Sequence, residues 1–589
     1  MVLKLSRAAL LAATIGLAAP VAFVLPVSAQ EKAKEVQQNE AIAFEIKVPS
    51  VIAVDSSMSE DQIKDVFTAN FLTHADQLAS LSASSITIPE MSFVLKVSGA
   101  GGGTSTVSYR DIVLTNVKDG HAEKLTVGSG EANSQGETTV YKAIAADGFD
   151  LKRLLEFAGI VKGDPTAPFK AIYGTATSGG SSQSGPMYSC EFGPTNSSGF
   201  EARPTKFNLN EFLQTVAKYP SGNEPPPEVL SSLISQVIDL VRGFRGGASA
   251  VGAIDCNVPG ELPITVKIAG ASTTDFEPAV YPEIRVSGLA VDAGPLGNGS
   301  LGEFLLKTID FNPTLNALES AAGKLSDEWF EENWRALLPS FGGMSLADFA
   351  VDAINPDSET GERVQAKLGS FDLSLGDYLN GIPTNVSATL AGLEVPLPQD
   401  STDPQVTTLL AAGLTGVNLG ADVAANWNKD SKTIAIEKIA MSAVDLGSMS
   451  ISAEIGNATE QLFAVDADTA MAASFGVTVK RVVIDVTDDG LGQIVWPLAA
   501  AQEGVTDIEA YRTQMAGFAE GVALQLLGST DAARQLGVAL GDFVTGRKGA
   551  ITITITSKDP NGIPLPLFMA AQEDPTVLTG QIDVTGTAQ

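Results

Sequence analysis

Two cysteines are the residues of this sequence that most clearly point to a covalent bond. The chain has 589 residues, and its two cysteines, Cys190 and Cys256, each lie in a short segment with strand character. Disulfides persist in exported proteins, and a bridge that closes a loop of this size stabilises a fold by about 4 kcal/mol in the chain-entropy model. We therefore predict a disulfide between them; the alternative is two separately buried thiols.

The sequence holds two histidines, His74 and His121. So small a number disfavours His-rich zinc sites and every Ser-His-Asp mechanism. His74 follows Phe67 by seven residues, which places it on or beside the apolar stripe of an expected helix and predicts a partly buried structural role. His121 follows a turn glycine, so we expect it on the surface.

Acidic clusters are the remaining candidates for chemistry. Asp485, Asp488 and Asp489, followed by Gly490, resemble a calcium loop, but the spacing of an EF-hand and its closing Glu are absent. We interpret this segment as a strand that ends in a turn. The motifs G-x-S-x-G, G-x-x-x-x-G-K-[ST] and H-E-x-x-H do not occur. We predict no catalytic, cofactor-binding or metal-binding residues and no cofactor, with a glycosidase-type pair of carboxylates as the alternative.

The charge balance excludes some classes of partner. The chain has 37 Lys and Arg against 69 Asp and Glu, a formal net charge of −32. Binding to nucleic acid or to anionic lipid head groups needs clustered Lys and Arg, and the sequence has no such cluster. Charged residues are only 18% of the chain, so we interpret the acidity as a contribution to solubility.

The first residues have the pattern of a secretory signal peptide. Lys4 and Arg7 precede an apolar stretch over residues 8–25, and Val27-Ser28-Ala29 offers small residues at the cleavage positions. This predicts cleavage after Ala29 and export to the periplasm or the medium; the alternative is a retained membrane anchor. No later segment has eighteen uninterrupted apolar residues, so we expect no integral membrane segment after cleavage.

Local patterns place several helices and strands. Ser59-Glu60-Asp61-Gln62 and Thr506-Asp507-Ile508-Glu509 are capping boxes that predict helix starts. Asp119-Gly120, between two strand-like runs, predicts a hairpin. Residues 432–441 and 551–556 read as strands, and residues 301–355 as mostly helical.

A degenerate repeat consists of a cap residue, Leu, any residue, a charged residue and an apolar pair. We predict a strand-to-helix module at each copy, because Ser, Asn and Asp suit the N-cap position; the alternative is a set of unrelated helix starts. The copies cover residues 150–155, 208–213, 300–305, 345–350 and 374–379.

The fold class that these patterns predict is α+β. We expect twisted, largely antiparallel β-sheets with amphipathic helices packed on one face and repeated strand-to-helix modules. The expected organisation is a signal peptide over residues 1–29, a β-rich region with helices and the disulfide over 30–290, a helix-rich region over 291–410, and an α+β module over 411–589.

The last third of the chain carries motifs that resemble a known group. They include Trp427, Val444-Asp445-Leu446-Gly447, Val483-Ile484-Asp485 and Pro564-Leu565-Pro566-Leu567. Their order over residues 415–589 resembles uncharacterised exported proteins of alphaproteobacteria, whose β-rich repeats are similar in style to AsmA-like envelope proteins. The AsmA-like comparison implies an elongated β groove that handles lipid, although this chain lacks a convincing retained anchor.

These observations favour an exported, non-enzymatic protein of the cell envelope. We expect it to bind a lipid, another apolar ligand or an envelope protein in a β groove. The alternatives are a secreted structural or adhesive surface protein and a carboxylate-dependent hydrolase.

Overall fold

The fold is that of a computed structural model, which describes most of the chain after residue 41. It describes residues 42–68, 75–97, 103–134, 136–219, 225–354, 361, 363–399, 401, 403–528, 530–571, 575–578 and 580–589. The expected signal peptide and His74 lie outside these residues. The described residues form two compact units: unit 1 extends to Asn298 and includes Thr308–Phe330, and unit 2 holds Gly299–Lys307 and Glu331–Gln589.

The described chain is mostly β, with 47% of its residues in strands and 27% in helices. Twenty-eight of the described strands belong to one large antiparallel sheet. The α+β prediction with amphipathic helices packed on one face is therefore wrong, since the helices are few and form no layer over a sheet face. The apolar residues recur mainly with a period of two along the chain, which builds strands, and the helices lie mostly in the connections between them.

The sheet of unit 1 begins with long strands and continues with pairs of short ones. β3 (Ala83–Val97) pairs with β4 (Gly103–Lys118), and β4 pairs with both β5 (His121–Val127) and β6 (Ser129–Ser134). From here the strands form two rows, one that starts at β5 and one that starts at β6. The row from β5 continues through β8 (Ile144–Asp150), β10 (Thr175–Ser178), β13 (Thr195–Ser197), β16 (Ser249–Val251) and β19 (Gly270–Thr273). The row from β6 continues through β7 (Glu137–Tyr141), β11 (Ser181–Ser184), β12 (Ser189–Phe192), β17 (Ile254–Val258) and β18 (Ile264–Ile268), and both rows end at β21 (Ile284–Asp292).

The hairpin predicted at Asp119-Gly120 is confirmed. These two residues join β4 to β5 with φ of 49° and 78°, and Lys118 pairs with His121 across the turn. Positive φ at both central residues is the geometry that suits a tight hairpin, and it explains why Asp-Gly stands here.

Helices pack against one end of the first strands of unit 1. α2 (Glu60–Thr68) begins with the predicted capping box: Ser59 N–H donates to Gln62 Oε1 at 2.9 Å, and Gln62 N–H donates to Ser59 Oγ at 3.2 Å. The core that α2 shares with α3 (Ala75–Ala79) and α4 (Leu151–Phe157) takes strand residues from the start of β3 and the end of β4. These helices therefore close the ends of strands.

A second core in unit 1 is aromatic. It surrounds a small sheet of β9 (Lys170–Tyr173), β14 (Phe200–Ala202) and β15 (Phe244–Gly246). Phe157 of α4 meets Phe200 and Phe244 edge-on, with ring centroids 6.3 and 5.8 Å apart. Such edge-to-face contacts add to the burial of the rings.

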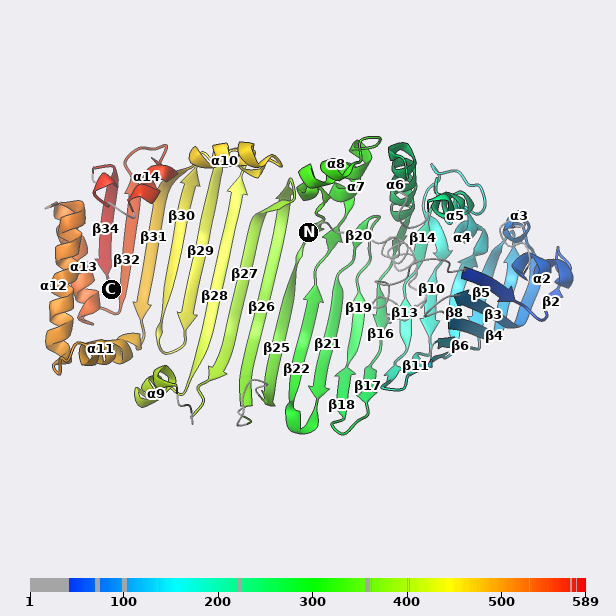
Figure 1. Ribbon diagram of the computed structural model, residues 1–589, viewed down its shortest axis with the longest axis horizontal. Helices are drawn as coiled ribbons and strands as arrows, with labels where there is room; N and C mark the ends of the chain where they lie inside the picture. Colours follow the sequence, from blue (N-terminus) through cyan, green and yellow to red (C-terminus); the bar gives the residue numbers. More distant parts are fainter. Residues whose placement is uncertain are drawn as a thin grey trace. The chain divides into compact units, whose positions relative to one another are not determined.

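Unit 2 contains an antiparallel meander of long strands (Figure 1). β22 (Gly297–Leu306) runs into Lys307, whose N–H donates to Gly343 O at the start of β25. The strands that follow are β25 (Gly343–Ile354), β26 (Arg363–Leu379), β27 (Ile382–Pro396), β28 (Gly416–Asn428), β29 (Thr433–Ala443), β30 (Gly447–Gly456), β31 (Thr478–Asp488), β32 (Ala550–Ser557) and β34 (Ile582–Ala588). The strands predicted over 432–441 and 551–556 are thus confirmed, except that Lys432 lies in the turn before β29.

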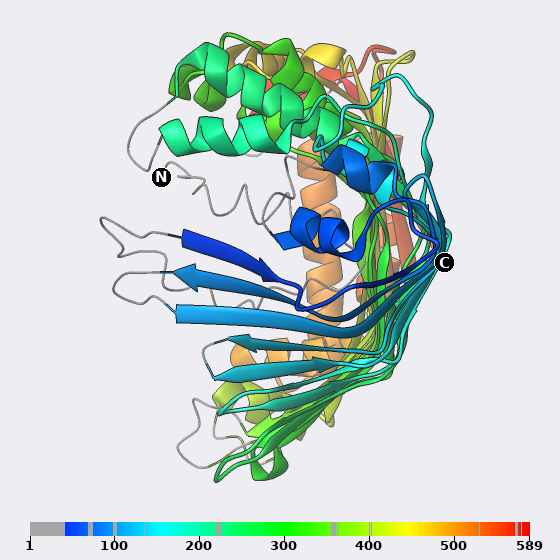
Figure 2. The same ribbon diagram turned by 90° about the vertical axis from the view of Figure 1, so that its right-hand side faces the viewer.

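Irregularities at mid-strand interrupt the ladders of unit 2. The register shifts between Leu390 and Leu393 of β27 and between Ile436 and Ile439 of β29. Asp348 and Gly392 adopt positive φ, of 55° and 66°. Bulges bend a strand and increase its twist, and Figure 2 shows the strands of unit 2 bent toward the side on which α12 (Ile508–Leu527, orange) lies.

The prediction that each copy of the repeat begins a helix is confirmed at two copies and wrong at three. Asp150 caps α4 by accepting from Arg153 N–H at 2.7 Å, and Asn208 caps α5 (Leu209–Lys218) by accepting from Glu211 N–H at 3.0 Å. The copies at residues 300–305, 345–350 and 374–379 lie in β22, β25 and β26. There the apolar residues continue with the period of a strand, and the charged residue of two copies, Asp348 and Asp377, takes positive φ inside the strand.

The helices of unit 2 lie in connections between strands. They are α9 (Pro404–Ala411), α10 (Ala467–Phe475), α11 (Leu491–Gln502), α12, α13 (Asp531–Val544) and α14 (Leu565–Ala570). The helix expected from Thr506 begins one residue later than its capping box requires, because Asp507 is the N-cap and accepts from Ala510 N–H at 3.0 Å. Residues 301–355, expected to be mostly helical, hold β22 and β25 beside α7 (Asn312–Ser320) and α8 (Asp327–Glu332).

Candidate apolar binding face

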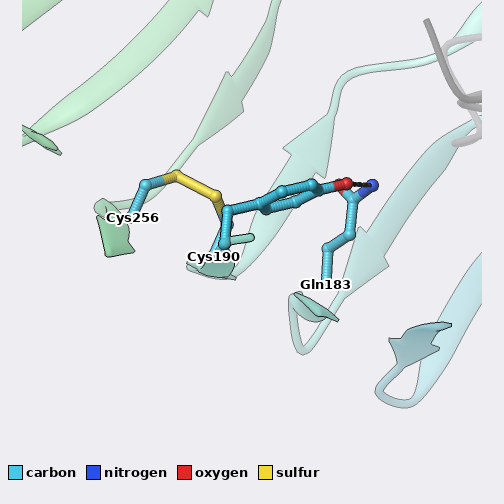
Figure 3. The surroundings of a disulfide bond; sticks show 4 residues. Gln183, Cys190 and Cys256 are labelled. Atoms are coloured by element: carbon cyan, nitrogen blue, oxygen red, sulfur yellow. Dashed lines mark hydrogen bonds between the residues drawn. A yellow bond between two sulfur atoms is a disulfide. The ribbon is translucent and has the colours of Figure 1, made fainter. Parts of the chain in front are cut away.

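The two cysteines form a disulfide within unit 1, as the sequence predicts. Cys190 on β12 and Cys256 on β17 are direct cross-strand partners, with Cα atoms 4.1 Å apart (Figure 3). Next to the bridge, Gln183 of β11 donates to the Tyr188 hydroxyl at 2.8 Å. The bond fastens neighbouring strands of one sheet, so its role is structural.

The other polar residues singled out in the sequence also have structural partners. His121 is half-exposed, with Nδ1 3.8 Å from Asp150 Oδ2. Asp488 accepts from the N–H groups of Gly490 and Gly492 at the start of α11, and Asp485 accepts from the Thr552 hydroxyl at 2.6 Å. Within the part of the chain that the structure describes, no three His, Cys, Asp or Glu side chains gather in a way that could hold a metal ion.

A polar cavity of about 260 Å³ lies in unit 1 near β14 and β15. Its cation, Arg245, donates to Glu201 through Nε and Nη2 at 2.8 and 2.7 Å and lies over the Phe169 ring. Asp275, which also lines it, accepts from Ala248 N–H. The Arg245 cation is therefore paired with Glu201, and the other charged groups of the lining are the carboxylates of Asp275 and Glu277.

A continuous apolar surface covers one side of the sheet in unit 2. Side chains directly opposite each other on paired strands point to the same side, so the registers define the members. We call this surface the apolar face. It consists of Leu368, Phe371, Leu373 and Leu375 of β26, Val386, Ala388, Leu390, Leu393 and Val395 of β27, Val417, Leu419, Ala421, Val423, Ala425 and Trp427 of β28, Ile434, Ile436, Ile439, Met441 and Ala443 of β29, Met449, Ile451, Ala453 and Ile455 of β30, Val482, Ile484 and Val486 of β31, and Ile551, Ile553 and Ile555 of β32.

The opposite side of the same strands is polar. It carries Ser387, Thr389, Asn418, Asp422, Asn426, Lys438, Ser450, Glu454, Asp485, Thr552 and Thr554. Lys438 Nζ lies 2.7 Å from Asp422 Oδ2, and this hydrogen bond holds the pKa of Asp422 below its ordinary value. A sheet with one apolar and one polar side is built to have its apolar side covered.

The helices that the structure describes in unit 2 cover one end of the apolar face. On α13, Leu536 packs with Val584 of β34 and with Ile553 and Ile555 of β32. Where this helix lies, Ile551 and Val584 are buried.

Elsewhere the apolar face is open. Among the described residues of β26–β30, no member of the apolar face is buried. Ile439 of β29 is 43% exposed, and the cross-strand pair Met441 and Met449 is 63% and 43% exposed. Contiguous exposed apolar areas beyond a few hundred Å² mark binding sites for ligands, membranes or proteins.

The two ends of the strands of unit 2 differ. Near the end of β28, Trp427 Nε1 donates to Ala458 O at 2.7 Å, and its ring lies 4.8 Å from that of Phe463 in η4 (Glu460–Phe463). Asn380, in the turn between β26 and β27, donates to Phe463 O at 2.9 Å. η4 therefore closes this end, whereas α9 and α11 lie at the other end (Figure 1). A cavity lies between α9 and α11.

Comparison with known proteins adds one match. A family model described only as an uncharacterized protein matches residues 440–589, from near the end of β29 to the last residue of the chain. No curated protein sequence matches the chain. The apolar face could not be recognised as a unit from the sequence, because a bulge moves its members from even to odd positions within β29.

Proposed function

We propose that this chain is an exported, non-enzymatic protein of the cell envelope that binds the alkyl chains of lipids on its apolar face. The observation that carries the proposal is the open apolar face on β26–β30. Leaving so much apolar surface in water is unfavourable by about 25 cal/mol for each Å², so the face gains free energy from any apolar cover.

The chemistry of the apolar face favours alkyl chains as the occupant. Its members are almost all aliphatic, and the Trp427 N–H is already bonded to Ala458 O. Such a surface offers no polar group to orient a partner, so it suits long chains that are held by burial alone. Two exposed methionines, Met441 and Met449, add flexible side chains that adapt to variable ligands.

Two observations support export. The intramolecular disulfide is typical of proteins that mature outside the cytosol. The expected signal peptide over residues 1–29 supplies the route. None of the helices in the described ranges is long and apolar enough to cross a membrane.

The test compares charges placed on the two sides of the sheet. The double variant Ile439→Asp with Ile451→Asp changes a cross-strand pair of the apolar face, and Ala440→Asp with Ser450→Asp changes the neighbouring pair on the polar side. We expect the first to weaken binding of a BODIPY-labelled diacylglycerol at least tenfold and the second to leave it unchanged. Circular dichroism checks that both variants keep their strands.

Mass spectrometry of the purified full chain provides the direct readout. We expect lipid in an organic extract of the wild-type protein and much less in the apolar-face variant. Equal binding by both variants, or a protein bound to the apolar face in place of lipid, contradicts the proposal.

A further inference from the structure

A cavity of about 530 Å³ separates α9 from α11 in unit 2. Ligand pockets in proteins take roughly 300–1,000 Å³, so the space is large enough for part of a lipid. The α9 side presents the small side chains of Ala411 and Ala412, and the α11 side presents Ile494, Pro497 and Leu498. The small residues on one wall leave the space between the two helices unfilled, and the apolar residues on the other give the cavity an aliphatic wall.

The cavity lies at the open end of the apolar face. α9 interrupts the connection between β27 and β28, where Leu397 N–H donates to Thr415 O at 2.9 Å. α11 follows β31, and Leu491 N–H donates to Leu446 O in the turn between β29 and β30 at 2.9 Å. The same turn ends β29 and begins β30, close in sequence to the exposed pair Met441 and Met449.

The polar atoms of the cavity are uncharged. None of its described lining residues is Asp, Glu, Lys, Arg or His, and its polar side chains are Thr407, Thr408 and Gln493. The Thr407 hydroxyl donates to Asp403 O at 3.0 Å, and its oxygen can accept a further hydrogen bond. Pro497 lies inside α11 and has no N–H, so it cannot donate to the carbonyl of Gln493 one turn earlier. Hydroxyl, amide and carbonyl groups recognise other neutral hydrogen-bonding groups, whereas an anion would find no cation here.

We propose that the cavity between α9 and α11 binds a lipid at its head-group end, with an uncharged, hydrogen-bonding head group such as glycerol and the alkyl chain continuing onto the apolar face. This inference rests on the proposed function, because it needs alkyl chains to bind the face. It adds a place for the head group and a preference for neutral over anionic lipids.

Site-specific fluorescence tests the proposal on the full chain. Both native cysteines are in the disulfide, so an introduced cysteine can be labelled alone. Acrylodan at Ala412→Cys reports the cavity, and acrylodan at Ala472→Cys, an exposed alanine of α10, is the matched control. The probes are 1-monooleoylglycerol and oleate, which share one alkyl chain and differ in the charge of the head group.

We expect monooleoylglycerol to shift the emission of the label at position 412 to the blue, at a concentration at least tenfold lower than oleate requires. The label at position 472 should stay unchanged. Adding Ala411→Trp, which fills the cavity, should abolish the shift at position 412.

Two outcomes overturn the inference without touching the proposed function. One is an acrylodan label at position 412 whose emission does not shift with monooleoylglycerol, in a protein that still binds BODIPY-labelled diacylglycerol. The other is an equal response to oleate and monooleoylglycerol, which removes the head-group preference. If no alkyl probe binds the wild-type chain at all, the proposed function itself fails.

Discussion

A single glycine sets the start of α11. Gly490 has φ of 155°, and a Cβ atom on it would lie 2.4 Å from Asp445 O in the turn between β29 and β30. We expect Gly490→Ala to destabilise unit 2 by about 1–3 kcal/mol, because the backbone must move to relieve the clash. Thermal unfolding followed by circular dichroism measures the loss.

The same substitution at a different glycine supplies the control. Gly521 lies inside α12, where a Cβ atom would have nothing within 4 Å. There alanine should raise stability by about 0.5–1 kcal/mol, because glycine is the weaker helix former. If both variants shift the melting temperature in the same direction, the steric argument for Gly490 is wrong.

Asp372 of β26 gives a pH dependence with a defined sign. Burial raises its pKa, but hydrogen bonds from Lys307 and Ser374 and the charge of Lys307 outweigh burial and hold the pKa below its ordinary value of 3.8. The Lys307 ammonium lies 2.8 Å from Asp372 Oδ2. The carboxylate therefore stabilises the fold fully above the ordinary pKa, and this contribution is lost as the pH falls through the lowered value.

Asp372→Asn should accordingly lower the melting temperature at about pH 7, and this effect should shrink as the pH falls below 3.8 and through the lowered pKa. The effect should be small, because Asp372 is half-exposed and water screens the pair. Melting curves across this pH range check the prediction, with the exposed turn residue Asp430→Asn as the control. A difference between wild type and variant that does not shrink as the pH falls refutes it.

At the scale of elements, the disulfide fastens β12 to β17. The bond closes a loop between residues 66 apart in the sequence, and such a constraint contributes about 4 kcal/mol in the chain-entropy model. We expect Cys190→Ala with Cys256→Ala to lower the melting temperature, and dithiothreitol to lower that of the wild type alone. A reductant effect on the double variant would show that the loss has another cause.

Individual strands were predictable from the sequence, but the side that each residue faces was not. Residues 432–441 read as a strand, and β29 contains all of them except Lys432. Within β29, Ile434 and Ile436 share a side with Ile439 and Met441 only because a bulge separates the pairs. The position of a bulge depends on pairing with the partner strand, and the local pattern of apolar residues carries no information about that pairing.

Helix starts were also only partly predictable from local sequence. Asp150 and Ser345 begin similar six-residue patterns, yet the first caps α4 and the second lies in β25. A capping motif shows only that a helix could begin at that residue. At Ser345 the chain forms a strand instead, because β25 pairs with β26 along a ladder that runs from Gly343 to Ile354. Tertiary pairing therefore overrides a local signal of comparable strength.

At the scale of the whole molecule, charge and apolar exposure have to be reconciled. The chain carries a net charge of −32 and also an open apolar face in unit 2. The repulsion between like-charged copies opposes association through that face, which agrees with the interpretation of the acidity as a solubility device. The AsmA-like resemblance stays a prediction, because the family model that matches residues 440–589 carries no function, and the apolar face is the surface on which its lipid-handling groove can be tested.

Hydrogen exchange read by mass spectrometry separates the two units in one experiment. A ligand that binds the folded state alone stabilises it by mass action and slows exchange where it covers or orders the backbone. Diacylglycerol should therefore slow exchange in β26–β30, whose apolar face is open, more than in β32, part of which α13 already covers. Dithiothreitol should instead speed exchange in β12 and β17, which the disulfide joins. Because the two agents act on different strands, protection by lipid that appears in β12 and β17 but not in β26–β30 would place the ligand outside the apolar face and refute the assignment of that face.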